Sequence, residues 1–178
     1  FVKPVKGSAS ININKVSRRE EVDVLLSCYD NLRMQEFMNG TEYGADVYVD
    51  MCSHKCTSIF VKEKIKMRAG ETDKSVSVKD PVLFDMIEKF AEDCGFTGMI
   101  DIDIFKIDGM YYISEVNPRF GGGYPHAYEC GVNFPARVLA NLGGETGEKA
   151  IGAYKEGICM MKYNEIAIRD MENVEIIR

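Results

Sequence analysis

Two alternating segments joined by an Asp-Gly pair constrain the fold of this chain more than any other feature. Residues 97–106 and 110–116 both have a strand-like pattern, and the pair that ends at Gly109 is a strong hairpin-turn signal. The pattern predicts an antiparallel hairpin with Asp103 and Glu115 on its two arms. A three-residue loop would set these carboxylates directly opposite each other, with Cβ atoms about 5 Å apart. A two-residue turn would leave them diagonal.

Two neighbouring carboxylates repel each other unless a cation lies between them. Asp103 and Glu115 offer hard oxygen ligands of the kind that Mg²⁺ or Mn²⁺ prefers, and Asn117 would add a neutral oxygen on the same face as Glu115. Alternating acids are also typical of a solvated strand face. The acids alone therefore leave both interpretations open.

The residues that follow the second arm favour a ligand site. Asn117 is followed by Pro118, Arg119 and then a run of three glycines at 121–123. The guanidinium fork of Arg119 matches phosphate or carboxylate oxygens, and glycines let a ligand approach the backbone closely. Such a polar, glycine-rich string beside apolar strands is unusual as a purely structural element.

The rest of the chain predicts further strands and helices without a repeated β-α-β unit. Extended structure is expected at residues 1–4, 11–13, 34–37, 42–52, 55–67 and 158–177. Helices are expected after a Ser17/Glu20 capping box, after Asp80-Pro81, and at 124–130 and 134–142. This combination predicts an α+β fold in which an antiparallel sheet packs against helices.

Composition and charge exclude several classes of protein. The chain has 178 residues, of which 46% are hydrophobic and 28% are charged, proportions that belong to a globular domain. No segment resembles a signal peptide or approaches the about 20 apolar residues of a membrane span. With 22 basic and 28 acidic residues and no basic cluster, the chain is not expected to bind nucleic acid. Its six scattered cysteines indicate free thiols and a cytoplasmic location.

Three blocks of sequence resemble the ATP-grasp superfamily, and they occur in the family's order. Residues 1–4 with 7–10 resemble the nucleotide-binding lysine strand and its phosphate-covering loop. Residues 35–42 resemble the adenine hinge and the acid that contacts ribose. Asp103 with residues 115–119 resembles the magnesium-binding signature. The Asn-Pro-Arg sequence followed by glycines is most similar to the carbamoyl-phosphate synthase large-subunit group and to amino-acid ligases of the pyrrolysine-pathway type.

The resemblance implies a set of contacts with ATP. Lys3 would contact the phosphates, and Glu42 would bind the ribose hydroxyls. Backbone groups of the loop, at Gly7, Ser8 and Ser10, would meet the phosphates. Backbone groups of the hinge, at Glu36, Phe37 and Met38, would meet the adenine edge. Lys66 and Arg68 follow the hinge, where relatives often place a basic ligand of phosphate or substrate, although a solvated basic face is an equal alternative.

The resemblance also implies the metal ligands and the reaction. Asp103, Glu115 and Asn117 would hold one or two Mg²⁺ (or Mn²⁺) ions, and Arg119, together with Asn117, would act in catalysis on the transferred phosphoryl group. A small-molecule carboxylate would attack ATP to form an acyl-phosphate, and an amine or ammonia would then displace phosphate. The alternative is a non-catalytic nucleotide-binding or assembly domain that retains the fold. The complete set of metal and phosphate residues favours the ligase.

The family pattern also implies a division of the chain. Residues 1–35 would form part of a small lobe, residues 36–145 a large lobe with the Mg-ATP site, and residues 146–178 an extended segment. The chain begins inside a strand, so we expect it to be part of a longer protein, without the N-terminal half of the nucleotide lobe. An open sheet edge of this kind would favour a homodimer.

Two further features carry alternative interpretations. Cys52, His54 and Cys56 would share a strand face, but no fourth ligand is evident, so zinc is not favoured. His126 follows the glycine run, and it would either face a substrate or be hydrogen-bonded locally at the start of a helix.

Overall fold

The computed structural model describes residues 1–6, 13–166, 168 and 170. The predicted phosphate-covering loop, with Gly7, Ser8 and Ser10, lies outside the described residues. The same holds for most of the strand predicted at 11–13.

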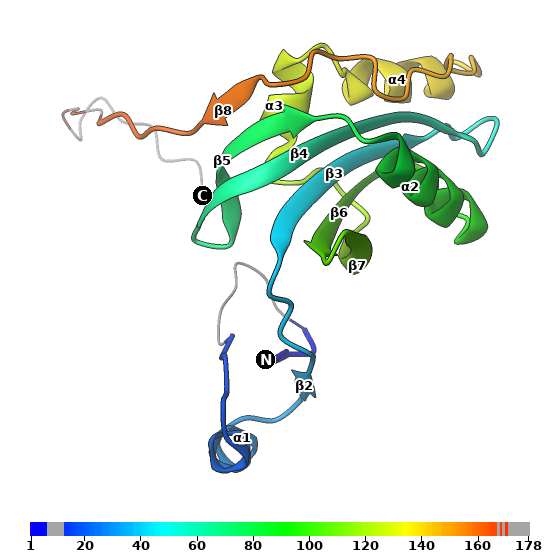
Figure 1. Cartoon of the computed structure of the whole chain (residues 1–178). Helices are drawn as coiled ribbons and strands as arrows, with labels where there is room; N and C mark the ends of the chain where they lie inside the picture. The colour runs from blue at the N-terminus through cyan, green and yellow to red at the C-terminus, as the bar shows by residue number, and fades with distance from the viewer. Residues whose placement is uncertain (7–12, 167, 169, 171–178) are drawn as a thin grey trace.

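The strands form two antiparallel sheets (Figure 1). In the smaller sheet, β1 (Val2–Pro4) pairs with β2 (Leu32–Met34), and helix α1 (Arg19–Cys28) lies between them in the sequence. The larger sheet has six strands in the order β7-β6-β3-β4-β5-β8. These are β3 (Thr41–Val49), β4 (Cys56–Arg68), β5 (Glu71–Val78), β6 (Gly98–Ile107), β7 (Met110–Asn117) and β8 (Cys159–Met161). The predicted α+β fold with an antiparallel sheet is confirmed.

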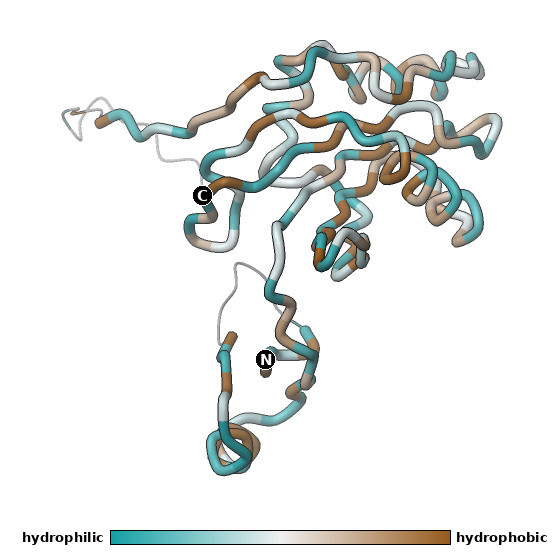
Figure 2. The backbone as a smooth tube through the Cα atoms, viewed as in Figure 1, coloured by the Kyte–Doolittle hydropathy of each residue, from teal (hydrophilic) through white to brown (hydrophobic). Residues whose placement is uncertain are grey.

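Helices cover both faces of the larger sheet (Figure 1). They are α2 (Pro81–Asp93) on one face, and α3 (Tyr124–Glu129) with α4 (Phe134–Leu142) on the other. Leu83 and Ile87 of α2 pack in one core with Val47, and Phe134 of α4 packs in a second core with Tyr48. Neighbouring residues of β3 thus point into different cores, which is why hydrophobic stretches run through the central strands (Figure 2).

The two predicted helix starts differ in their outcome. Asp80 caps α2 as expected, because its Oδ1 accepts a hydrogen bond from the Val82 N–H at 3.0 Å. At α1, the acid that pairs with Ser17 is Glu21 rather than the predicted Glu20. The Glu21 carboxylate accepts a hydrogen bond from the Ser17 N–H at 2.7 Å. The helix begins at residue 19, so the third helical position, which faces back to the cap, falls on Glu21.

Three strand assignments also differ from the expectation. β2 ends at Met34, where the sequence predicted a strand to begin. β5 was not predicted, because its sequence is polar and three of its buried side chains are Thr72, Ser75 and Ser77. In the segment predicted to be extended from residue 158, the described strand is β8, whose three residues pair with β5.

All six cysteines lie in the described part of the chain, and each is a free thiol, as expected. No helix among residues 1–6 and 13–166 has the length and apolar character of a membrane span.

Candidate functional site

A cleft of about 1100 Å³ lies against the larger sheet and is also lined by the smaller sheet and the segment that joins them. It brings together most of the predicted site residues: Lys3, Glu36, Phe37, Met38, Glu42, Arg68, Asp103, Glu115, Asn117 and Arg119. Lys66 is exposed and does not line this cleft. The described residues of the three sequence blocks therefore meet at one place in the fold.

The two carboxylates of the hairpin stand directly opposite each other. Asp103 on β6 pairs with Glu115 on β7, although the turn between the strands has only two residues. Its second residue is Gly109, with φ 82°. A two-residue turn alone would place Ser114 opposite Asp103, but a bulge between positions 113 and 115 leaves Ser114 without a partner in the register. The bulge moves Glu115 into line with Asp103.

Each of the three predicted metal ligands contacts a cationic side chain. The contacts are Asp103 Oδ1 with Lys64 Nζ at 2.6 Å, Glu115 Oε2 with Lys3 Nζ at 3.4 Å, and Asn117 Oδ1 with Arg119 Nη2 at 3.3 Å. Lys64 and Lys3 thus offset the negative charges of Asp103 and Glu115.

The oxygen donors at this place fit a magnesium ion. Two carboxylates and one amide oxygen come from the adjacent strands β6 and β7, and Mg²⁺ usually binds one or two protein carboxylates together with water and phosphate oxygens. Within the described residues, no group of three or more His, Cys, Asp or Glu side chains is arranged to hold a metal. The protein thus offers a partial set of ligands, which a phosphorylated ligand would complete.

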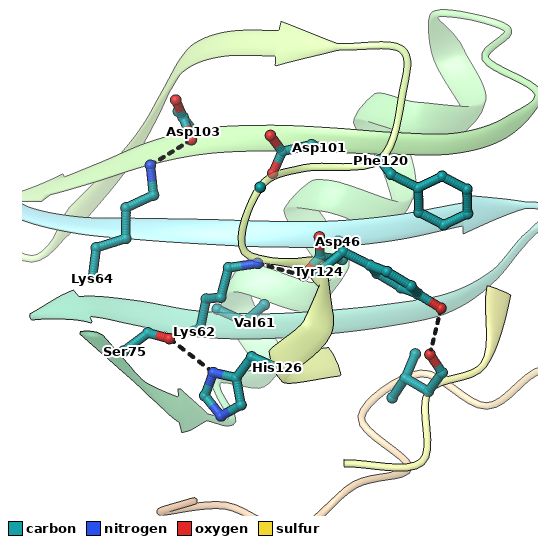
Figure 3. Close-up of polar contacts among 12 residues, drawn as sticks. Asp46, Val61, Lys62, Lys64, Ser75, Asp101, Asp103, Phe120, Tyr124 and His126 are labelled. Atoms are coloured by element: carbon teal, nitrogen blue, oxygen red, sulfur yellow. Dashed lines mark hydrogen bonds and ion pairs between the residues drawn. The ribbon is translucent and has the colours of Figure 1, made fainter. Parts of the chain in front are cut away.

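Lys64 is a central residue of the cleft that the sequence did not single out. Its side chain is only 4% exposed, and its Nζ contacts Glu42 Oε1 at 2.7 Å in addition to Asp103 (Figure 3). Burial by itself would lower the pKa of Lys64, but the charges of Asp103 and Glu42 outweigh burial and raise it above its usual value. Lysines alternate at 62, 64 and 66, and an irregularity in the pairing after Lys64 separates it from Lys66.

The glycine run packs directly on Asp101. A Cβ atom at Gly121 would lie 2.5 Å from the Asp101 carboxylate. Burial raises the pKa of Asp101 to about 6, an increase that Lys62 opposes and Asp46 reinforces. Arg119 Nη1 lies 4.0 Å from Asp101 Oδ2, at the open side of the cleft.

A buried ion pair lies beneath the glycine run. Lys62 Nζ contacts Asp46 Oδ2, and both side chains are at most 2% exposed (Figure 3). A Cβ at Gly123 would approach Lys62 Cε to 2.8 Å, so the backbone of the run rests on this lysine. Sequence reasoning missed this pair, because Asp46 and Lys62 appear as ordinary polar positions of alternating strands.

The predicted hinge lies beside β1. The ring of Phe37 is 6.2 Å from the ring of Phe1, and Lys15 Nζ lies 3.8 Å from the centre of the Phe37 ring. Phe37 of the hinge and Lys3 both line the cleft.

The two alternative interpretations are resolved by local contacts. His126 is 2% exposed, with Nδ1 2.8 Å from Ser75 Oγ and Nε2 3.0 Å from the Ile158 carbonyl. Since a carbonyl only accepts, Nε2 carries the proton; burial also lowers the pKa of this imidazole. His126 is therefore hydrogen-bonded locally. The strand face predicted for Cys52, His54 and Cys56 is wrong, because residues 51–53 form a turn and β4 begins only at Cys56. Burial raises the pKa of Cys56 to about 12.

Comparison with known proteins identifies the family. A sequence model of the family described as ATP-grasp in the biosynthetic pathway with Ter operon matches residues 29–166, which is more than half of the chain. No curated protein matches the sequence.

Solved structures show the same fold. An L-amino acid ligase from Bacillus licheniformis has a TM-score of 0.59 and 22% identity, over 84% of this chain and 39% of that one. The ADP complex of PurK, an N5-carboxyaminoimidazole ribonucleotide synthetase, has a TM-score of 0.61 and 16% identity, over 83% and 42%. The biotin carboxylase domain dimer of the Hydrogenobacter thermophilus 2-oxoglutarate carboxylase, with MgADP, ADP and bicarbonate, has a TM-score of 0.66 and 14% identity, over 89% and 39%.

These structures are similar to this chain in fold, and the chain spans about two-fifths of their length. The resemblance to the ATP-grasp superfamily is confirmed by the family match over residues 29–166, which contains the second and third sequence blocks. The chain belongs to the ATP-grasp family.

Proposed function

We propose that the chain is the metal- and nucleotide-binding part of a Mg-ATP-dependent ligase that joins a small-molecule carboxylate to an amine or to ammonia. The observation that carries this proposal is the single cleft in which the opposed acids Asp103 and Glu115 meet Lys3 and Glu42. The similar structures support it, since one is an amino acid ligase and others contain ADP or MgADP.

Nucleotide binding follows from the chemistry of the cleft walls. Lys3 is 16% exposed and would bring its ammonium to the phosphates, while Glu42 would accept hydrogen bonds from the ribose hydroxyls. The hinge residues Glu36, Phe37 and Met38 would meet the adenine, with backbone amides of Gly7, Ser8 and Ser10 at the phosphates.

The proposed metal ligands lie on the hairpin, and Arg119 follows its second strand by two residues. Asp103, Glu115 and Asn117 would hold Mg²⁺ or Mn²⁺, which when bound neutralises phosphate charge. Arg119, 59% exposed at the mouth of the cleft, would stabilise the transferred phosphoryl group and then the acyl-phosphate. Arg68 lines the same cleft and would contact the carboxylate substrate; Lys66 would act only at its rim.

The two sheets suggest how the parts divide the work. Residues 1–35 would close over the nucleotide, residues 36–145 would supply the Mg-ATP site, and residues 146–178 would complete the larger sheet through β8. The substrates would be small molecules. We place the ligase in the cytoplasm, and an open edge of the smaller sheet would favour a homodimer.

Calorimetric titration tests the proposal. The chain is titrated with a non-hydrolysable ATP analogue, with and without Mg²⁺, beside the variant Asp103→Asn/Glu115→Gln. The proposal expects binding that depends on Mg²⁺ and weakens at least about tenfold in the variant. Equal binding by both proteins would contradict the metal assignment. ADP release from ATP is then measured with Mg²⁺ and candidate carboxylates and amines. A chain that binds nucleotide but releases no ADP would instead be a non-catalytic nucleotide-binding domain.

A further inference from the structure

Lys64 joins two acids that come from different parts of the site. Glu42 stands near the start of β3, next to the hinge, and Asp103 stands in the middle of β6. The Lys64 ammonium contacts both, at 2.7 Å and 2.6 Å respectively, while each acid remains 28% exposed to the cleft. One buried cation thus contacts both Glu42, which is proposed to bind ribose, and Asp103, which is proposed to bind the metal.

The path of the Lys64 side chain is made possible by a glycine. β3 lies between β4 and β6, so Lys64 must cross β3 to reach Asp103 (Figure 3). Gly44 is the residue of β3 that pairs with Asp103. A Cβ on Gly44 would lie 3.2 Å from Lys64 Cε and 3.1 Å from Lys62 Cε, closer than side chains normally pack. The absence of a side chain at this strand position therefore gives the lysine its path.

A divalent cation at Asp103 has to compete with the lysine. The ammonium lies within hydrogen-bond distance of the carboxylate, so a bare dication would meet a positive charge a few ångströms away. The phosphates of a nucleotide are anions, and they supply the negative charge that a second cation needs at this place. Repulsion by Lys64 is therefore strongest when the metal arrives without a nucleotide.

We propose that Lys64 is a positioning residue that holds Asp103 in an ion pair and so makes tight binding of a divalent cation depend on a bound nucleotide. The inference rests on the proposed function for its nucleotide, while its claim about the bare cation stands on the contacts of Lys64 alone. The coupling is reciprocal, so the cation also strengthens nucleotide binding.

Titration with Mn²⁺ tests the inference, with free Mn²⁺ measured by electron paramagnetic resonance, in the presence and absence of ADP. Without ADP, Lys64→Met should bind Mn²⁺ at least about tenfold more tightly than the wild type, because a positive charge beside the ligand is removed. ADP should raise the Mn²⁺ affinity of the wild type by a larger factor than that of Lys64→Met.

Two controls identify the source of the effect. Lys74→Met removes an exposed lysine from the neighbouring strand β5, outside the cleft, and should bind bare Mn²⁺ as the wild type does. The double variant Lys64→Met/Asp103→Asn should lose the gained affinity if the new binding is at Asp103. A purely structural role for Lys64 would not increase cation affinity in any of these proteins.

The inference is overturned if Lys64→Met binds Mn²⁺ without nucleotide no more tightly than the wild type does. This holds even if the variant binds nucleotide normally. If no protein binds ADP, the proposed function fails, and a tighter bare Mn²⁺ site in Lys64→Met still supports the ion-pair competition. Circular dichroism verifies that each variant is folded. Lys64→Gln, which keeps a polar side chain of similar reach, provides the same comparison if Lys64→Met does not fold.

Discussion

The carboxylate of Asp101 occupies the space that a side chain at Gly121 would need. A Cβ at position 121 would lie 2.5 Å from Asp101 Oδ1, and the φ angle of Gly121 is not in the left-handed region. The glycine is required by this close approach and not by its backbone conformation. Asp101 and the glycine run thus form one packed unit at the floor of the cleft.

Gly121→Ala should therefore destabilise the protein by overpacking, with a decrease in the free energy of unfolding of about 1–3 kcal/mol. Urea denaturation measures this. The double variant Gly121→Ala/Asp101→Ala should recover part of the loss relative to the sum of the single changes, because the smaller side chain at 101 makes room. If the double variant loses the full sum of the two single changes in unfolding free energy, the contact between positions 121 and 101 is contradicted.

The hairpin that aligns Asp103 with Glu115 depends on a backbone conformation at its turn. Gly109 has φ 82°, and a Cβ there would meet no atom within 4 Å. Gly109→Val should lower the free energy of unfolding by about 1–2 kcal/mol through backbone strain alone. Asp108→Asn is the matched control and should have little effect, since Asn is favoured at such turn positions. Equal stability of Gly109→Val and the wild type in chemical denaturation would argue against the left-handed turn.

The ion pair of Lys62 with Asp46 is buried, so removal of one partner leaves an uncompensated charge. Lys62→Met should cost about 3–5 kcal/mol of stability. The double variant Lys62→Met/Asp46→Leu should be clearly more stable than Lys62→Met, because the Asp46 charge is then not left unpaired in the core. Lys89→Met removes a lysine from the exposed pair with Asp93 and should leave the thermal midpoint nearly unchanged. If Lys62→Met and Lys89→Met lose similar amounts of stability, the burial of the Lys62–Asp46 pair is contradicted.

Asp50 should make stability depend on pH. Burial by itself would raise the pKa of Asp50, but hydrogen bonds from Asn141, Gly147 and Ser53 outweigh burial and hold the pKa well below its usual range. The folded state therefore binds this proton less readily than the unfolded state. The stabilisation is complete above the unfolded pKa of about 3.9 and is lost as the pH falls further.

Asp50→Asn should lower stability at pH 7 by about 1.5–3 kcal/mol, because its amide would face a hydrogen-bond donor in either orientation. The carboxylate oxygens accept from the Asn141 side chain and the Gly147 N–H on one side and from Ser53 on the other. In urea denaturation, the difference between wild type and variant should shrink from pH 7 to pH 3. A difference that is equal at the two pH values would contradict the lowered pKa.

Much of the fold follows from local patterns in the sequence. The Asp-Gly turn, the Asp80 cap and the alternation of residues 42–52 each predict an element that the structure contains, although β3 already ends at Val49. β5 is different, because its buried positions carry Thr72, Ser75 and Ser77, and no hydrophobic alternation marks it. Pairing with β4 makes it a strand, and that pairing is not visible in a short window of sequence.

Some residues of the site can likewise be recognised in the sequence, and others only in the structure. The acid, the amide and the arginine of residues 115–119 can be recognised as a group because they are close in sequence. Lys64 cannot, since three alternating lysines look alike until strand pairing selects the one that reaches Asp103. The bulge at Ser114 likewise decides which residue faces Asp103.

The sequence by itself determined the chemical groups of the site and the local elements that carry them, because turns, caps and alternation act over a few residues. Only the tertiary structure decided the register of the strands, the path of Lys64 across Gly44 and the burial of Lys62 with Asp46. These depend on contacts between strands far apart in the chain, where a bulge of one residue changes which side chains meet.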